Sequence, residues 1–476
     1  MNNPVTKKAR QMIFIVLMIS SIIGALLQTS LTTALPVIIH DLKVSAATAQ
    51  WLTSAYALAM GIMVPISPFL LKRFKTKKLF LSGMGMYMIG LLLCATSNIF
   101  PTLLLGRIVQ ALGNGILLPM TQVIILTIYP PEKRGSAMGI YGLAVGAAPV
   151  LAPTITGMVI DILDWHVIFW FALIVVAMNI VLACAFMKDA LENEKQSFDL
   201  LSLLLSASGY SGLVFGLGNL GTYSFFSIAV ALPLLVGIIM LGLFTLRQLR
   251  LENPFLELRT FKNREFRLSV IMSMLLYAIM MGGSTLFPLY IQIVHGLSAT
   301  KSGLIMMPGS LAMAAISPFA GKIYDKFGMR LLAVSGSAFM VFSCIATSFV
   351  GESTSIIYLT LMYVARLIAI SLIMMPIVTW GMSTMDEKYT SHGTALLTSL
   401  RTIAGAVGSA VFVAIMAFVT RVTSESDKIT ANAFGINAAF IGISALAVVL
   451  FAVSAFFVGR RKKTYETVPI FQNETN

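Results

Sequence analysis

Long apolar stretches, separated by short polar breaks, follow one another along almost the whole chain. A helix needs about 20 apolar residues to cross a hydrocarbon core of about 30 Å, and stretches of this length recur from Met12 to Gly459. The ten-residue alternation of an outer-membrane barrel does not occur, and lipid otherwise accommodates helices, which satisfy their own backbone groups. The pattern predicts an all-α membrane protein with fourteen spans, at about 12–34, 49–71, 79–96, 101–128, 136–160, 167–187, 201–219, 224–246, 268–290, 302–321, 331–349, 356–382, 392–420 and 437–459.

The composition of the chain supports the same class. Of 476 residues, 58% are hydrophobic and 11% are charged, whereas an ordinary soluble domain has roughly 25% charged residues. The first apolar stretch has no small-residue cleavage pattern and is followed at once by a second span. We therefore expect it to be a retained helix and not a signal peptide.

Lys and Arg are distributed unevenly between the two sets of loops. An even number of spans places both termini on one side, and that side holds 26 of the 33 basic residues. Short cytoplasmic loops concentrate Lys and Arg, so both termini are expected in the cytoplasm and the protein in the cell membrane. The net charge of +14 follows from this topology. The basic residues form no continuous footprint, so no nucleic-acid partner is expected.

Cysteine and histidine positions argue against other chemistries. Cys94, Cys184 and Cys344 lie in three separate spans, which favours packing over disulfides. The four histidines lack metal-ligand spacing, and no Gly-rich phosphate loop with a Lys occurs. The active site of an enzyme would bring together an acid, a His or a nucleophile, and the sequence shows no such cluster. We expect no metal, no cofactor and no enzymatic activity, with the proton gradient as the energy source.

The chain repeats itself in two loops. One begins at Ile66–Phe69 and the other at Ile316–Phe319, and their ends, Ser82 and Ser335, lie 253 positions apart. The repeat predicts a six-helix half at 1–187, a central two-helix insert with linkers at 188–267, a second half at 268–459 and a tail at 460–476. Halves of this kind rock against one another around a site near the midplane.

The second loop carries a family resemblance. Its residues 321–330 resemble the inner-loop signature of the major facilitator superfamily, and nearly the whole chain looks like that superfamily's fourteen-span drug:proton antiporters of the EmrB/QacA type. The resemblance implies the major facilitator fold. In that signature an Asp and an Arg at helix ends latch the two halves together. It implies a gate made of Arg73, Gly321, Asp325, Gly328 and Arg330.

Asp325 is expected to accept hydrogen bonds from the N-terminus of a neighbouring helix. In the first loop, Lys72 and Lys75 stand where the family has its Asp and Gly, which leaves Arg73 without the expected local acid. The alternative interpretation of both loops is a solvated, positively charged inner surface.

Three arginines lie inside predicted spans: Arg107, Arg366 and Arg401. An Arg within a span costs about 2.5 to 3.5 kcal/mol on insertion scales, so it normally faces the bundle interior or water and marks a pathway. Arg107 shares one helical face with Gln110 and Asn114, in a motif similar to the family's intramembrane Arg motif. Snorkelling to the surface, or bonding to backbone carbonyls, is the alternative interpretation.

Span five matches the family's antiporter motif in the spacing of its small residues. These residues predict a groove for a second helix and a bend that would suit a hinge. The motif positions are Gly139, Gly142, Gly146, Pro149, Pro153 and Gly157.

Span one departs from the family pattern, because Leu27 stands where an acid is common. The segment resembles the subset of the family that includes lincomycin exporters. No acid is placed near the bilayer centre, and Asp161 is the best-placed carboxylate to exchange a proton, although it is as readily a solvated cap. The candidate substrate pocket contains Gln28, Thr32, Tyr56, Tyr277 and Met281.

Together these observations predict an exporter of amphipathic, drug-like small molecules, driven by protons, embedded in the lipid bilayer and monomeric. Three arginines without a central acid favour neutral, zwitterionic or anionic cargo over dications. An exporter of a single metabolite or lipid-like compound is the nearest alternative. A membrane sensor that no longer transports is the alternative from another class.

Overall fold

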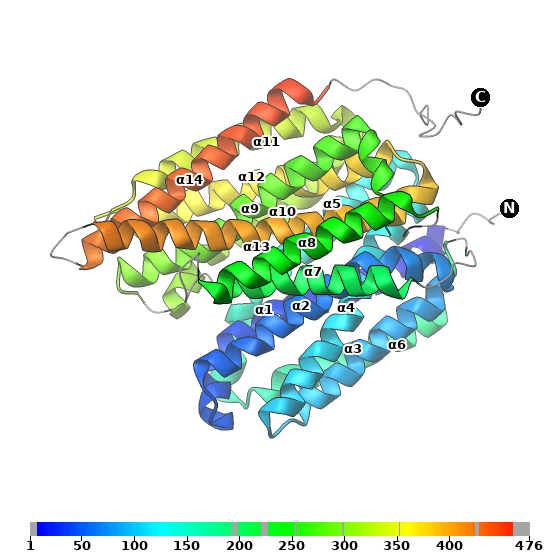
Figure 1. The fold of residues 1–476 in the computed structure, drawn as a ribbon, viewed down its shortest axis with the longest axis horizontal. Helices are drawn as coiled ribbons and strands as arrows, with labels where there is room; N and C mark the ends of the chain where they lie inside the picture. Colours follow the sequence, from blue (N-terminus) through cyan, green and yellow to red (C-terminus); the bar gives the residue numbers. More distant parts are fainter. Residues whose placement is uncertain are drawn as a thin grey trace.

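The computed structural model consists of long helices and short connections (Figure 1). It describes residues 7–459 except 192, 194–198, 220–226, 253, 255, 298, 352 and 424–427. Some side chains within the helices also lie outside the description, among them those of Thr32, Pro149, Pro153 and Asp161. The helices are α1 (Lys7–Leu42), α2 (Ala46–Arg73), α3 (Thr76–Ala95), α4 (Phe100–Ile128), α5 (Pro131–Ile162), α6 (His166–Phe186), α7 (Leu200–Asn219), α8 (Ile228–Arg250), α9 (Arg264–Ile293), α10 (Ala299–Phe327), α11 (Met329–Ala346), α12 (Ile356–Ser383), α13 (Thr390–Val422) and α14 (Lys428–Phe457), with short 3-10 helices η1 (Leu258–Lys262), η2 (Thr347–Phe349) and η3 (Glu387–Tyr389).

The described helices confirm the predicted all-α membrane fold. Thirteen of them are long and apolar enough to cross a bilayer, and the remaining long helix, α5, has several side chains outside the description. The helices extend past the apolar stretches that predicted them. Helix α14 begins at Lys428, well before the predicted start at 437, because helix-compatible residues precede its apolar part.

Successive helices run in opposite directions, so α1 begins and α14 ends at the same end of the bundle (Figure 1). We call this the termini end and the opposite one the far end. Local sequence explains several boundaries. Ser45 and Asn263 precede α2 and α9, and their side chains accept hydrogen bonds from the backbone N–H groups of Thr48 and Phe266. Gly328 separates α10 from α11 with φ of 78°, a conformation that favours glycine.

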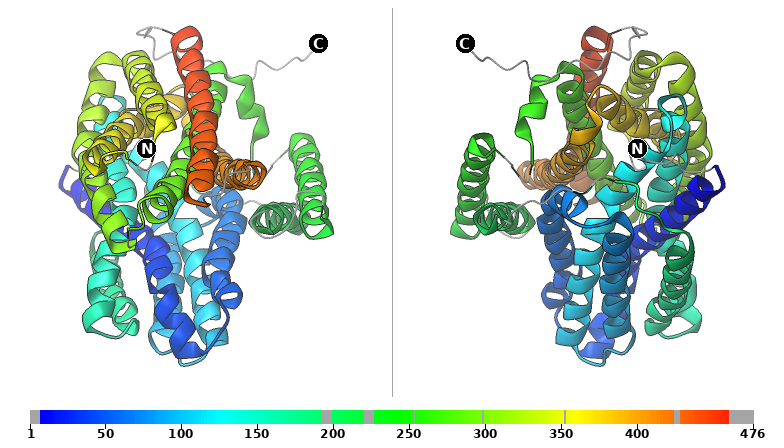
Figure 2. Two further views of the ribbon diagram at one scale, coloured as in Figure 1. Left: turned by 90° about the vertical axis from the view of Figure 1, so that its left-hand side faces the viewer. Right: turned by 90° about the vertical axis from the view of Figure 1, so that its right-hand side faces the viewer.

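Two six-helix halves make up the body of the molecule. Helices α1–α6 form the N-terminal half and α9–α14 the C-terminal half, and Figure 2 shows them stacked, with blue and cyan helices below yellow and red ones. The halves meet through α5 against α10 and α12, and through α2 and α4 against α13. This arrangement places the middles of α4, α5, α9 and α13 near the centre of the molecule.

Helices α7 and α8 form an antiparallel pair beside the two halves (Figure 2). Glycines allow the pair to pack closely, because a Cβ at Gly212 would lie 2.5 Å from the Pro233 carbonyl. At the termini end, Arg247 donates from Nε and Nη2 to the Asp199 carboxylate, both at 3.0 Å. Burial raises the pKa of Asp199, but the hydrogen bonds from Arg247 and Ser202 outweigh it and hold that pKa below its ordinary value.

Helix α7 is the member of the pair that contacts both halves. Its Tyr210 ring lies against Gly61 of α2, and Phe215 lies against Trp51 with ring centroids 5.1 Å apart. It also contacts α13. Helix α8 is mostly exposed.

The outward faces of the helices are apolar. Ile228 is 79% exposed and Phe456 is 82% exposed, so lipid is the solvent that these side chains require. Cys94 and Cys344 are buried as expected from packing. Cys184 is exposed on α6, so packing does not account for it, because it lies on the outer face of a helix that is buried on one side only.

Candidate transport site

Arg107 is fully buried in the N-terminal half, so it does not snorkel to the surface. Its Nη1 donates to Gln110 Oε1 at 2.8 Å and to the Leu27 carbonyl at 3.4 Å. Its guanidinium lies 4.1 Å from the centroid of the Tyr56 ring, and Asn114 Nδ2 donates to the Tyr56 hydroxyl at 2.9 Å. The predicted face of α4 is therefore one polar group that ties α4 to α1 and α2.

Arg366 has an equivalent position in the C-terminal half. It is 1% exposed, and its Nη2 donates to the Ile279 carbonyl of α9 at 2.5 Å. A Cβ at Gly283 would overlap the guanidinium, so this glycine makes room for it. Leu27 and Ile279 lie 252 positions apart, close to the spacing of the sequence repeat. In each half, an Arg of the fourth helix thus bonds to a backbone carbonyl of the first helix.

Arg401 differs from both of these arginines. It is 2% exposed on α13, and its Nε and Nη1 have no hydrogen-bond partner. Its guanidinium lies 4.8 Å from the centroid of the Tyr277 ring of α9, a cation–π contact that stabilises the charge but leaves its donors free. It also lies within electrostatic range of the Tyr141 hydroxyl of α5.

Further polar side chains, on helices of both halves, lie in the region of Arg401. Gln122 of α4 donates from Nε2 to the Tyr141 hydroxyl at 3.4 Å, while Gln122 Oε1 and the Thr398 hydroxyl are buried without a partner. We call this group the central polar cluster. Its members are Gln122, Tyr141, Tyr277, Thr398 and Arg401.

Sequence reasoning identified Arg401 and Tyr277 as candidates but missed Gln122 and Tyr141 as members of their group. The signal that was available is a Gln inside an apolar span, one turn after Pro119. Such a residue needs a polar neighbour, but the sequence alone does not say which helix supplies it.

Asp325 joins the two halves at the termini end. Its carboxylate accepts from the backbone N–H groups of Gly135 and Ser136, both at 2.8 Å, and from the Ser136 hydroxyl at 2.5 Å. These groups lie in the second turn of α5, near the end of the helix where its dipole favours an anion. The structure therefore places the acid against a helix N-terminus of the opposite half.

Of the other predicted gate residues, the glycines lie at a close contact and at a turn, and the arginines are exposed. A Cβ at Gly321 would overlap the Gly135 carbonyl, so this position permits backbone-to-backbone approach. Gly328 makes the turn that follows α10. Arg73 and Arg330 are exposed, and no ion pair involves either one in the described part of the chain.

Some of the predicted small residues of α5 line its contact with neighbouring helices of the other half. A Cβ at Gly139 would lie 2.7 Å from the Ser317 carbonyl, and the Ser317 hydroxyl donates to the Gly139 carbonyl at 2.9 Å. Gly142 and Gly146 face Met375 and Met313. At Gly157 no described atom lies within 4 Å of a Cβ, so the structure shows no helix packed against this position. The side chains of Pro149 and Pro153 lie outside the described residues.

The predicted substrate pocket is not one group. Tyr56 belongs to the Arg107 group, whereas Tyr277 and Met281 lie on α9 facing α13, where a Cβ at Gly405 would lie 2.9 Å from Met281 Cγ. Gln28 is exposed on α1. The side chain of Thr32 lies outside the described residues.

Asp161 lies in the last turn of α5, and its side chain is outside the description. Its neighbour Asp164, in the loop before α6, is bonded to His166 through the backbone N–H and the ring. Burial raises the pKa of Asp164, but the bonds to His166 outweigh it and hold that pKa below its ordinary value. Asp164 therefore stays ionised near neutral pH, which makes it a poor proton carrier.

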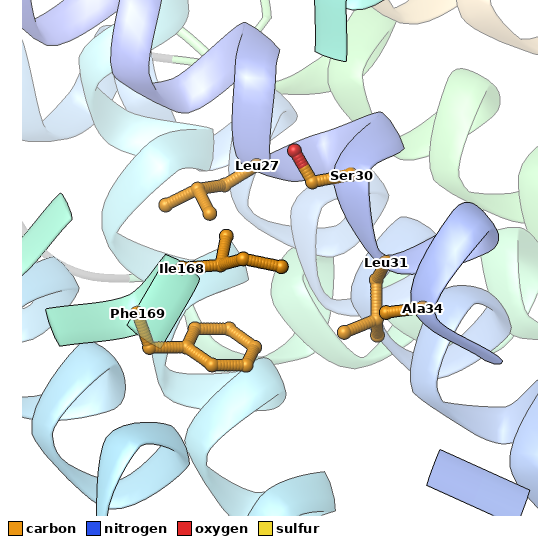
Figure 3. Close-up of a pocket in the computed structure, with 6 residues that line it drawn as sticks. All are labelled: Leu27, Ser30, Leu31, Ala34, Ile168 and Phe169. Carbon is orange, nitrogen blue, oxygen red and sulfur yellow. The ribbon is translucent and has the colours of Figure 1, made fainter. Parts of the chain in front are cut away.

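A small apolar pocket lies between α1 and α6 (Figure 3). The side chains of Leu27 and Ile168 reach into it, and the Ser30 hydroxyl donates to the Leu26 carbonyl of its own helix at 2.8 Å. With about 210 Å³ of empty space it is too narrow for a drug-sized molecule. A wider surface groove of about 470 Å³ lies between α7 and α8, outside the two halves.

Two packed six-helix halves with buried polar groups between them define a membrane transporter and not an enzyme. The model of the Major Facilitator Superfamily matches residues 17–409. The chain belongs to this superfamily.

Comparison with individual relatives supports membership of the superfamily. The chain is 36% identical over 456 residues to the uncharacterized MFS-type transporter YcnB of Bacillus subtilis, covering 95% of this chain and 97% of that protein. It is also 36% identical over 460 residues to the lincomycin resistance protein LmrB of Bacillus subtilis, covering 94% and 96%. Among solved structures, the human organic anion transporter MFSD10 matches with a TM-score of 0.66 at 15% identity, covering 94% of this chain and 99% of that one.

Proposed function

We propose that the protein exports amphipathic, drug-like compounds from the cell by alternating access, driven by the proton gradient. In this proposal the termini end faces the cytoplasm, as the concentration of Lys and Arg at that end favours. The kinship with LmrB, a protein named for lincomycin resistance, supports a drug as cargo.

The observation that carries the proposal is the central polar cluster between the halves, combined with the contact of α5 with α10. At the termini end Asp325, Gly135 and Gly321 hold the halves together, whereas at the far end Gly157 faces open space. This is the arrangement expected when a central site is closed to one side of the membrane. Opening the termini end would require the Asp325 hydrogen bonds to break.

The charge of the interior favours some cargoes over others. Arg107, Arg366 and Arg401 are buried, and no ion pair neutralises any of them among the residues that the structure describes. Like charges in a low-dielectric interior repel by several kcal/mol. Neutral, zwitterionic or anionic amphiphiles are therefore the proposed cargo, and dications are disfavoured.

Proton coupling is proposed to involve Asp161, the carboxylate at the far end of α5. Asp164 is less suited because its bonds to His166 keep it ionised. The same transport assay separates two alternatives. One is an exporter of a single metabolite or lipid-like compound, and the other is a sensor that does not transport.

The test measures accumulation of a lincosamide and of a neutral fluorescent amphiphile in cells that lack their main native pumps, with and without a protonophore. Lower accumulation with the protein, lost with the protonophore, is the expected result, and Asp161→Asn should reduce it. Equal accumulation with and without the protein would favour the sensor. Export of a single compound from a broad panel would favour the narrow exporter.

The orientation has its own test. In a background without Cys94, Cys184 and Cys344, a cysteine at Lys75 should resist an external impermeant thiol reagent, and one at Asp427 should react. Labelling at position 75 from outside would reverse the proposed orientation.

A further inference from the structure

Among the three buried arginines that the structure describes, Arg401 is the one whose guanidinium makes no hydrogen bond to the described residues. Arg107 and Arg366 each donate to a main-chain carbonyl within their own half. Arg401 has free Nε and Nη1 donors although it is 2% exposed, and the contact that the structure describes for it is the face of the Tyr277 ring. Arg107 Nη2 and Arg366 Nη1 also lack a partner among the described residues, but each of these guanidinium groups is anchored by another hydrogen bond, and that of Arg401 is not.

A buried guanidinium with unmade hydrogen bonds is costly, and water or an anionic ligand removes that cost. The position of Arg401 favours a ligand, because it lies between the halves and not within one of them. Helix α13 contacts α9 on its own side and α2 and α4 on the other. A molecule bound there would touch both halves, as alternating access requires.

The neighbours of Arg401 suit a carboxylate better than a cation. The Thr398 hydroxyl lies one turn before Arg401 on the same helix and has no partner, so it can donate to an acceptor oxygen. The Tyr141 hydroxyl accepts from Gln122, which leaves its own hydrogen available for donation. Arg401, Thr398 and Tyr141 thus each keep a donor for which the described residues supply no acceptor. Gln122 Oε1 is an unpartnered acceptor, which a polar N–H or O–H group of the same ligand would satisfy.

We propose that the central polar cluster binds an anionic group of the carboxylate class on the cargo, with Arg401 as the residue that makes the charged hydrogen bonds. This rests on the proposed export function and narrows its substrate class. The cluster then selects amphiphiles that combine an apolar body with an acid or zwitterionic head.

The test uses the full-length protein in nanodiscs of phosphatidylcholine, titrated with dansyl-aminoundecanoic acid and with its primary amide, which differ in charge and little in shape. Empty nanodiscs correct for partition into lipid. A hydrogen bond to a charged group corresponds to a change of about tenfold or more in affinity, so the wild type should prefer the acid by about tenfold. Arg401→Gln should bind acid and amide alike, and Arg401→Lys should keep part of the preference.

The matched control is Arg421→Gln, which removes the same charge from an exposed position of the same helix and should keep the wild-type preference. Thr398→Val removes a donor without a change of charge and should weaken acid binding by several-fold. It provides a second reading if Arg401→Gln fails to fold.

Equal binding of acid and amide by the wild type, or an acid preference that survives Arg401→Gln, would overturn the assignment. These outcomes are separate from failure of the proposed function. A protein that exports neutral amphiphiles from cells but binds acid and amide equally retains its function and loses this inference. A protein that lowers no compound's accumulation in cells loses the function, whatever it binds in nanodiscs.

Discussion

The halves of this transporter meet along two interfaces that differ in kind, although the sequence repeat relates them. At α5–α10, backbone approaches backbone through Gly135 and Gly321, and four hydrogen bonds join the helices. At α2–α13, α7 packs beside the contact, with Tyr210 against Gly61 of α2 and close to Ser399 of α13. One interface is closed by direct contact and the other is supported by a third element.

The sequence explains the difference. The end of α10 and the turn after it have Asp325 and Gly328, whereas the repeat-related positions at the end of α2 are Lys72 and Lys75. A lysine cannot accept hydrogen bonds from a helix N-terminus, and its charge is unfavourable there. The comparison teaches that the acid of one loop is enough to anchor one interface, while the other depends on apolar packing against α7.

The largest effect is expected from Gly321→Val. A Cβ at this position would overlap the Gly135 carbonyl, so α5 and α10 would separate at the termini end and efflux should be lost. Drug accumulation measured at matched membrane expression checks this. Gly303→Val is the control on the same helix, where nothing lies within 4 Å of a Cβ, and it should keep efflux. Activity in Gly321→Val would mean that the close approach is not needed.

Asp325→Asn should have the next largest effect. An amide keeps one acceptor oxygen but loses the charge and the second acceptor, and bonds to a charged group contribute about 1.5 to 3 kcal/mol. Efflux should fall by about tenfold or more, and a cysteine near the termini end of α5 should react faster with thiol reagents. Asp386→Asn, another acid lost from the same end, is the control. Wild-type efflux and labelling in Asp325→Asn would remove the carboxylate from the gate.

Lys72→Asp tests whether the missing acid accounts for the asymmetry. By the sequence repeat, an acid there would be placed toward α13 as Asp325 is toward α5, and a carboxylate near a helix N-terminus contributes about 0.3 to 1 kcal/mol. A rise in thermal stability of the purified protein, with slower turnover, is the expected result. Lys75→Asp places the acid one turn away and should do less. If neither variant differs from wild type, the lysine does not account for the difference between the two interfaces, and the packing of α7 against the α2–α13 interface does.

The smallest effect concerns pH and the Asp199–Arg247 bond that fixes α7 to α8. The pKa of Asp199 is lowered in the folded protein, so its stabilisation is present above the ordinary Asp value near 3.9 and is lost as the pH falls through the lowered value. Both side chains are partly exposed, so solvent screening keeps the effect on stability small. Melting temperatures from pH 7 to pH 3 for wild type and Asp199→Asn should converge at the acid end. If the two curves of melting temperature against pH run parallel, the bond between Asp199 and Arg247 does not contribute to stability.

Much of the fold was predictable because lipid imposes a simple rule on sequence. Each apolar stretch became a helix, and the repeat around Asp325 predicted the two halves. The spacing of Arg107, Gln110 and Asn114 also predicted their shared face. These features depend on residues within one helix or one loop.

The features that could not be predicted depend on which helices become neighbours. Gln122 and Tyr141 lie 19 positions apart on two helices, and their meeting with Arg401 follows from packing between the halves. Gly157 matches the spacing of the small-residue groove, but no described atom lies within 4 Å of a Cβ there. Arg366 and Arg401 look alike in sequence, and only the folded chain shows that the guanidinium of Arg366 donates to a backbone carbonyl while that of Arg401 has no such bond to the described residues.

The contact of α7 with both halves has a kinetic consequence. Because one helix contacts both α2 and α13, no displacement of one half relative to the other can leave both of its faces undisturbed. Trp51 lies at one of these contacts, against Phe215. The indole ring is therefore a fluorescent probe, native to the chain, of how far and how fast the halves move apart.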